Sequence, residues 1–168
     1  MIARQLPARK PENRLFSIRQ FGRMTALSVH MLQVDVRHLG GVRFEADARG
    51  HRIISDQPIA NGGQDTGMTP PEFLLASVAT CAGYYAAEYL KLRGIPMGGM
   101  AVRVEADKAA NPARLASFHI EVTVPALPEA HRDGVLKAVK KCLIHNTLLN
   151  TPHIGIGVNT PHAPALAA

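Results

Sequence analysis

The sequence predicts a single domain of the α+β class with a largely antiparallel sheet. Two observations predict this class. Segments in which apolar and polar residues alternate, as in half-buried strands, stand on both sides of a long helical stretch at residues 69–94. Short turns join neighbouring strand segments, which is typical of antiparallel hairpins. With 168 residues, of which 46% are hydrophobic, the chain is long enough to bury one core.

Three strands are expected before the helix. The first is predicted at residues 29–36, where apolar and polar residues alternate. The pair Gly40-Gly41 predicts a turn into a second strand at residues 42–46, and a third strand is expected at residues 51–56. Residues 61–67 are interpreted as a linker, because they lack the spacing of a phosphate-binding loop and follow no βαβ pattern.

The start of the first helix is explicit in the sequence. Thr69 is the expected N-cap, Pro70 suits the first turn, and Glu72 completes a capping box three residues after the cap. A basic residue and a glycine, Arg93-Gly94, predict the end of the helix. Its apolar face is expected to carry Leu74, Val78, Cys81, Tyr85 and Leu92. Cys81 should therefore point toward the core.

A hairpin and a second helix are expected after the first helix. Alternation at residues 102–107 and at residues 118–124 predicts two long strands that turn near Asn111-Pro112. The second helix is predicted to run from Pro128 to about His145, at residues 128–145, with Cys142 on its apolar face.

Two positions in the second half complete this layout. Gly134 lies inside the predicted helix, where glycine costs about 1 kcal/mol relative to alanine. Ile154, Ile156 and Val158 alternate with glycine or asparagine and predict a last short strand. The remaining residues, 161–168, are expected to form a frayed tail.

Positive charge is concentrated at the N-terminus. Residues 1–23 carry six basic residues against one acid, Glu12, whereas the rest of the chain has a net charge of only about +1. We interpret residues 1–23 as an extension, either disordered or upstream of a true start at Met24, and residues 24–160 as the domain. The body of the chain is not basic and has no Trp, so no nucleic-acid partner is expected.

Membrane insertion and secretion are not expected either. No apolar run approaches the roughly 18–20 residues that span a bilayer. Two cysteines in a chain of this size do not make a secreted disulfide scaffold. The expected location is therefore the cytoplasm.

Each of the two cysteines, Cys81 and Cys142, has two interpretations. Position alone favours a small buried hydrophobe, because free cysteine is among the most buried residue types. A nucleophilic Cys81 would need a cation from another element, since it lies three turns inside its own helix. Cys142 and His145 could bind a metal, but the chain offers no second matching pair, so we expect neither metal nor cofactor.

Two blocks of sequence resemble the OsmC/Ohr family. The first is PEFLLASVATC, which ends at Cys81, and the second is KKCLIHNTL around Cys142, 61 residues after Cys81. Both blocks stand in the order and spacing of the family, with a predicted hairpin between them. The resemblance covers about residues 25–158.

The resemblance implies an OsmC-like fold with two long central helices in an intertwined homodimer. It also implies a thiol-dependent hydroperoxide reductase that acts in oxidative-stress defence. Cys81 would attack the O–O bond of an organic or lipid hydroperoxide, and Cys142 would resolve the sulfenic acid as a disulfide. A dithiol reductant would close the cycle. Arg43, which follows the first turn, matches the place of the arginine that the family sets beside its thiolate.

One position departs from the family pattern. The best-studied peroxidases of the family hold this arginine with a glutamate ten residues before the cysteine, where this chain has Pro71. Glu72 lies one residue later, which is a rotation of about 100° on a helix. The capping box explains Glu72 by itself. The alternative function is a non-catalytic, dimeric OsmC-like protein that binds an apolar ligand and whose cysteines are structural.

Overall fold

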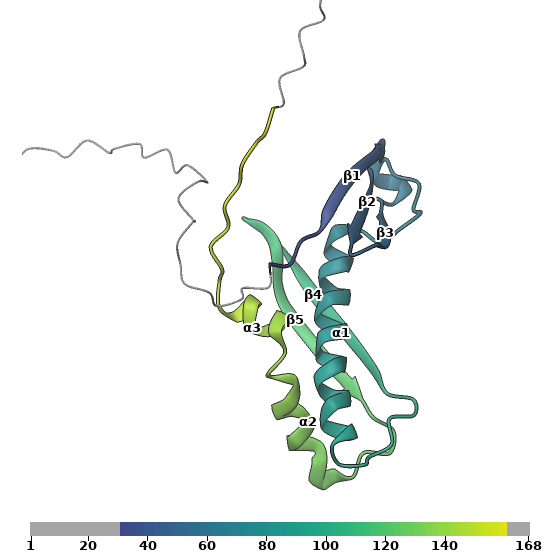
Figure 1. Ribbon diagram of the computed structural model, residues 1–168, viewed down its shortest axis with the longest axis vertical. Helices are drawn as coiled ribbons and strands as arrows, with labels where there is room; N and C mark the ends of the chain where they lie inside the picture. Colours follow the sequence, from purple (N-terminus) through teal and green to yellow (C-terminus); the bar gives the residue numbers. More distant parts are fainter. Residues whose placement is uncertain (1–30, 161–168) are drawn as a thin grey trace, which may run out of the picture. The chain divides into compact units, whose positions relative to one another are not determined.

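The computed structural model describes residues 31–160, and its helices and strands all lie in the unit Asp35–Ala168 (Figure 1). Of the other unit, Met1–Val34, only residues 31–34 are described, and they form neither helix nor strand. The predicted extension and tail lie outside the described residues. Five strands and three α-helices within residues 31–160 confirm the α+β class.

The first three strands form an antiparallel sheet in the order β1-β2-β3. They span Asp35–Gly40, Arg43–Ala48 and His51–Ser55. The predicted turn after Gly40 is confirmed, and both turn glycines have positive φ, which non-glycine residues rarely adopt. The predicted bounds of the first strand were wrong, because pairing with β2 begins only at Asp35. The start of that prediction, at residues 29–30, lies outside the described residues.

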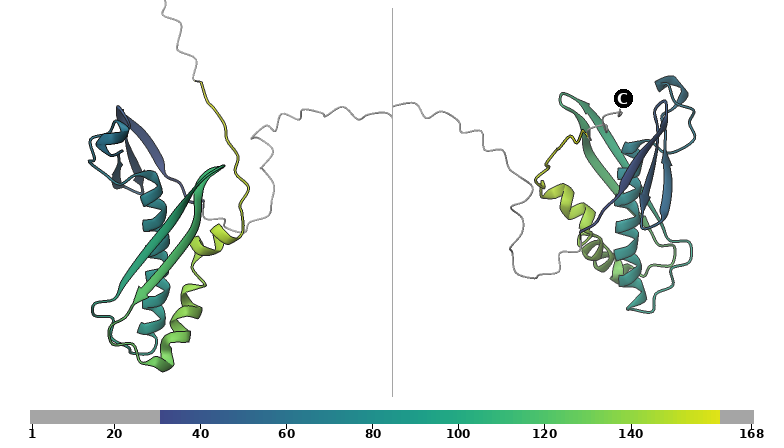
Figure 2. Two further views of the ribbon diagram at one scale, coloured as in Figure 1. Left: turned by 180° about the vertical axis from the view of Figure 1, so that it is seen from behind. Right: turned by 45° about the horizontal axis from the view of Figure 1, so that its top comes forward.

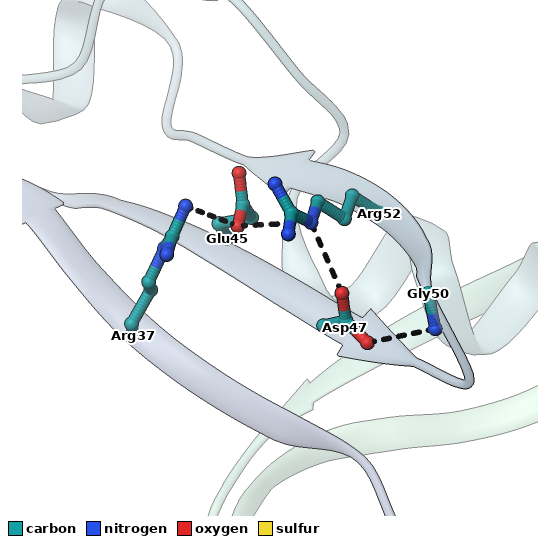
Figure 3. A network of polar contacts seen from close by, with 5 residues as sticks. All are labelled: Arg37, Glu45, Asp47, Gly50 and Arg52. Carbon is teal, nitrogen blue, oxygen red and sulfur yellow. Dashed lines mark hydrogen bonds and ion pairs between the residues drawn. The ribbon is translucent and has the colours of Figure 1, made fainter.

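One face of this sheet carries a ladder of ion pairs, which Figure 3 shows. Arg37 of β1 stands opposite Glu45 of β2 and contacts its carboxylate at 2.7 Å. Arg52 of β3 stands opposite Asp47 and contacts it at 3.1 Å. Hydrogen bonds from the Gly50 N–H and from Arg52 lower the pKa of Asp47 below its usual value. Pairs of opposite charge across neighbouring strands favour this register over a shifted one.

The helix α1 spans Pro70–Lys91, after the short 3-10 turn η2 at Ile59–Asn61. Its start at the N-cap Thr69 is confirmed. Its buried stripe is made of Val78, Ala82, Ala86 and Leu90, all fully buried. The predicted face was therefore partly wrong. Val78 is in the core, but Cys81 is only partly buried and Leu92 is 79% exposed.

The predicted long hairpin is confirmed as β4, Ala101–Ala110, and β5, Ala113–Thr123. It runs alongside α1, as Figures 1 and 2 show. The two elements are in packing contact, since a Cβ at Gly83 would lie 3.4 Å from the Val102 side chain of β4, an ordinary van der Waals distance. One face of α1 is thus buried against the hairpin β4–β5.

The predicted second long helix was wrong, because the chain forms two short helices. A 3-10 turn η3 at Glu129–His131 leads into α2, Arg132–Val139, and α3 follows at Leu143–Leu149. The helix is broken at Cys142, whose φ and ψ of −53° and 126° are not helical. The predicted last strand at residues 154–158 was also wrong, since those residues form no strand in the described chain.

The core cluster lies where α2 packs on α1. Ala86 and Leu90 of α1 meet Val135 of α2, and partly buried residues of β5 and the connecting loops surround them. Gly134 lies at this contact, because a Cβ there would overlap the hydroxyl group of Tyr89. The glycine that weakens α2 by propensity is therefore required by packing.

We expect Gly134→Ala to destabilise the protein. The new methyl group would displace the Tyr89 ring from its hydrogen bond with His131, and forced repacking of this kind costs about 1–3 kcal/mol. Gly83→Ala is the matched control, because its Cβ makes an ordinary contact and alanine favours a helix by about 1 kcal/mol. The free energy of unfolding from urea titration should fall only in the first variant. Equal stability of the two variants would contradict the packing role of Gly134.

Candidate active site

The two cysteines come from different elements of the fold and are both free thiols. Cys81 lies within α1, directly before the buried Ala82, and is partly exposed. Cys142 lies at the junction between α2 and α3 and is fully buried. The structure thus gives them unequal access to solvent.

The break in the helix decides the surroundings of Cys142. The residue is the N-cap of α3, and its Sγ accepts a hydrogen bond from the backbone N–H of His145 at 3.4 Å. The predicted place of His145 near the end of a helix was therefore wrong, since it lies in the first turn of α3. Its ring Nδ1 is buried and has no hydrogen-bond partner within the described residues.

The structure places the two thiols close enough for Cys81 to influence the protonation of Cys142. Burial raises the pKa of Cys142 above its usual value, and Cys81 raises it further, both as a hydrogen-bond partner and by its charge when ionised. The backbone N–H groups of His145 and Ile144 act in the opposite direction but do not outweigh these effects. These effects favour the protonated thiol of Cys142.

Arg43 is not brought to this pair within one chain. Its Nη1 donates a hydrogen bond to Oε1 of Gln64 at 3.2 Å, and no hydrogen bond between the described residues joins it to either cysteine. Its Nε is buried and has no hydrogen-bond partner among these residues. Of the predicted site residues, Cys81 and Cys142 lie near each other, whereas Arg43 contacts Gln64 and has no hydrogen bond to either cysteine within the described residues.

Glu72 does not hold the arginine. Its carboxylate accepts hydrogen bonds from the backbone N–H of Thr69 at 2.7 Å and from the Thr69 hydroxyl at 2.8 Å. These bonds lower the pKa of Glu72 below its usual value. The carboxylate is thus used to cap α1, as the sequence predicted.

Two residues that support Arg43, namely Gln64 and Asp56, were not predicted from the sequence. The fully buried Asp56 accepts hydrogen bonds from the N–H groups of Gln57, Gln64 and Thr66 and from the Thr66 hydroxyl, at 2.8–3.1 Å. Burial alone would raise the pKa of Asp56, but these bonds prevail and lower it to about 2. The available sequence signal was the position of Asp56 between a strand and a glycine-rich loop, because aspartate often organises turns.

A cavity of about 250 Å³ lies beside Arg43. It is lined by Arg43, Asp56 and Gln64 together with the glycine turns at residues 40–41 and 62–63. Asp56 thus fixes Gln64 through its backbone, and Gln64 in turn holds the guanidinium. This arrangement can present a cation to a group that enters from outside the chain.

No three side chains of His, Cys, Asp or Glu are grouped so that they could hold a metal ion within residues 31–160. No helix in the same range is long and apolar enough to cross a membrane.

The family assignment follows from the sequence comparison. The family described as OsmC-like protein matches residues 62–157, which is more than half of the chain. The chain belongs to the OsmC family. The matched range includes both cysteines, so the resemblance of the two sequence blocks is confirmed. No curated protein sequence matches this OsmC-like protein significantly.

Solved structures share the fold of this OsmC-like protein. A protein from Psychrobacter arcticus, named for an osmotic stress induced and detoxification response, is 23% identical with a TM-score of 0.64, over 70% of this chain and 88% of its own. An OsmC-like protein from Mycoplasma pneumoniae is 19% identical with a TM-score of 0.57, and the match covers 72% of this chain and 89% of that protein. The organic hydroperoxide resistance protein OsmC of Legionella pneumophila is 14% identical with a TM-score of 0.53, and the match covers 73% of this chain and 92% of that protein.

We expect Asp56→Asn to destabilise this protein in a pH-dependent way. The folded pKa of Asp56 lies below its unfolded value, so the carboxylate stabilises the fold fully above about pH 4 and loses this effect as the pH falls toward 2. The difference in free energy of unfolding between wild type and variant should therefore be largest near neutral pH and shrink between about pH 4 and pH 2. Urea titrations at several pH values measure it. A difference that stays constant over this range would show that the charge of Asp56 does not stabilise the loop.

Proposed function

We propose that this OsmC-like protein is a thiol peroxidase that reduces organic hydroperoxides, with Cys81 as the attacking thiol and Cys142 as the resolving thiol. One observation carries the proposal: Cys81 lies close enough to Cys142 to raise the pKa of its thiol, although the two residues are 61 positions apart in the sequence. Structural cysteines have no need of each other, whereas a redox pair must be in reach. The names of two relatives of similar fold, organic hydroperoxide resistance proteins, agree with this proposal.

The order of the roles follows from access and protonation. Cys142 is fully buried, so a peroxide reaches Cys81 first. The raised pKa of Cys142 keeps it as a thiol, which can donate a hydrogen bond to a thiolate at Cys81. A thiolate is the nucleophile in attack on a peroxide.

The proposed cycle balances in three steps. The Cys81 thiolate attacks the terminal oxygen of ROOH, the O–O bond breaks, and the alkoxide takes up a proton to leave as ROH. The thiol of Cys142 then condenses with the Cys81 sulfenic acid, which forms a disulfide and releases water. A dithiol reductant returns both cysteines to thiols and becomes a disulfide itself. A reducing compartment such as the cytoplasm would supply this reductant.

The cycle also fits the apolar neighbourhood of Cys81. Val78 and Ala82 of the same helix belong to the core, and Tyr85 follows one turn later. Apolar surroundings favour peroxides with an organic body over hydrogen peroxide. We therefore propose organic or lipid hydroperoxides as substrates.

We further propose that the active form is a homodimer. The face of the first sheet that lies opposite its ion pairs carries Val36 and Ile53, which share this face because both stand opposite Ala46. Their exposed fractions are 61% and 50%, which is unusual for the apolar face of a sheet. Near the C-terminus, Ile156 is 92% exposed. A second copy that covers these surfaces would remove them from water.

The dimer would also explain the place of Arg43. Within one chain its guanidinium contacts Gln64 and neither thiol. We propose that Arg43 of one subunit stabilises the Cys81 thiolate of the other, since a cation within about 4–6 Å favours the ionised form.

The first test traps the intermediate. In Cys142→Ser the sulfenic acid of Cys81 cannot be resolved, so cumene hydroperoxide should leave Cys81 reactive toward dimedone. Mass spectrometry of the adduct measures this, and wild type should show a disulfide between Cys81 and Cys142 instead. Cys81→Ser is the control and should lose peroxidase activity by about a thousandfold or more. If Cys81 stays reduced under these conditions, the peroxidase is excluded and the non-catalytic binding protein becomes the better description.

The second test asks which subunit supplies the arginine. Cys81→Ser and Arg43→Ala are each expected to be nearly inactive as homodimers. After unfolding and refolding of an equal mixture, heterodimers should contain one intact site and restore about one quarter of the wild-type activity. No recovery would place Arg43 in the site of its own chain, and an active Arg43→Ala homodimer would place it outside any site. A mixture of Cys81→Ser with Cys142→Ser is the control, because both cysteines act within one chain and no recovery is expected.

A further inference from the structure

A second cavity, of about 650 Å³, opens between the C-terminal half of α1 and the helix α2. Its volume is typical of sites that bind small organic molecules. Neither cysteine lines it, although Tyr85 in its wall follows Cys81 by one helical turn and Lys141 directly precedes Cys142. It is therefore separate from the thiols and close to them in the chain.

The cavity has an excess of positive charge. Arg93, Lys137 and Lys141 line it together with a single carboxylate, Glu88, which leaves a net charge of +2. Among the described residues, none of these three cations forms an ion pair. Clefts lined mainly by one sign of charge concentrate ligands of the opposite sign.

One of these cations is held in place by the cavity wall. The guanidinium of Arg93 stacks on the Tyr89 ring, 3.7 Å from its centroid, and its Nη1 donates to the Tyr89 carbonyl at 3.4 Å. The Tyr89 hydroxyl hydrogen-bonds with Nδ1 of His131 at 3.1 Å, and Gly134 leaves the room that this ring needs. The remaining N–H groups of a fixed guanidinium can bind a carboxylate in a fork.

The rest of the wall is apolar or small. Tyr85 and Leu92 of α1 and Ala138 of α2 line the cavity. Leu92 is 79% exposed, so a ligand would cover it. An apolar body beside a cluster of cations suits an amphipathic anion.

We propose that this cavity binds an organic acid, with its carboxylate among Arg93, Lys137 and Lys141 and its apolar body against Tyr85, Leu92 and Ala138. The site goes beyond the proposed peroxidase and does not depend on it, since no step of binding uses a thiol.

The test is calorimetric titration of the reduced, full-length protein in the absence of peroxide. Octanoate is the probe, octanamide is its uncharged match, and acetate provides the charge without the apolar body. We expect octanoate to bind at least about tenfold more tightly than octanamide or acetate. Octanamide lacks the charge that contacts the cations, and acetate lacks the apolar body. Equal affinity for octanoate and octanamide, or no binding of octanoate at millimolar concentration, would overturn the proposal.

Two double variants of equal net charge locate the site. Lys137→Gln with Lys141→Gln removes two cations from the cavity, and octanoate affinity should fall by about fivefold or more. Lys91→Gln with Lys140→Gln removes two exposed cations that do not line the cavity, and the affinity should stay within about twofold of wild type. Circular dichroism verifies that both variants are folded. Equal loss in both variants would assign the binding to general charge attraction and contradict the site.

Discussion

The close packing of one face of α1 is the constraint on which the rest of the described fold depends. The stripe Val78, Ala82, Ala86 and Leu90 is fully buried, and two of its four members are alanines. The small side chains of α1 let the hairpin β4–β5 and the helix α2 pack close to the axis of α1. Cys81 lies next to this stripe, so its position is fixed by the packing of its neighbours rather than by its own burial.

The same packing explains why Cys142 lies near Cys81 although only Cys81 is on a long helix. α2 is anchored on α1 through Val135, beside Ala86 and Leu90. The chain then leaves the helix for Cys142 and enters α3. This break lets the sulfur cap α3 at a place near Cys81. A continuous helix would have given the N–H groups at the start of α3 carbonyl partners in the preceding turn, and no side-chain cap would have been needed.

Local signals predicted the elements that have local causes. The N-cap and capping box of α1, the turn after Gly40 and the long hairpin are set by residues close in sequence, and all were predicted. The break at Cys142 was missed because no glycine or proline marks it. The contact of Arg43 with Gln64 joins residues 21 positions apart, which no period or motif reveals. The pairing of the cysteines was implied by family resemblance rather than by any local pattern.

The partner of Arg43 has a consequence for its charge. A carboxylate that holds a guanidinium also offsets part of its positive field, whereas the amide of Gln64 holds it without a charge. Pro71, at the family position of the glutamate, starts α1, and Glu72 is used to cap it. In this chain the guanidinium of Arg43 contacts a neutral side chain, Gln64, whose loop is fixed by the buried Asp56. The ionised Asp56 lines the same cavity and offsets part of the field of Arg43, but no ion pair joins the two within residues 31–160, so the guanidinium can still pair with an approaching anion.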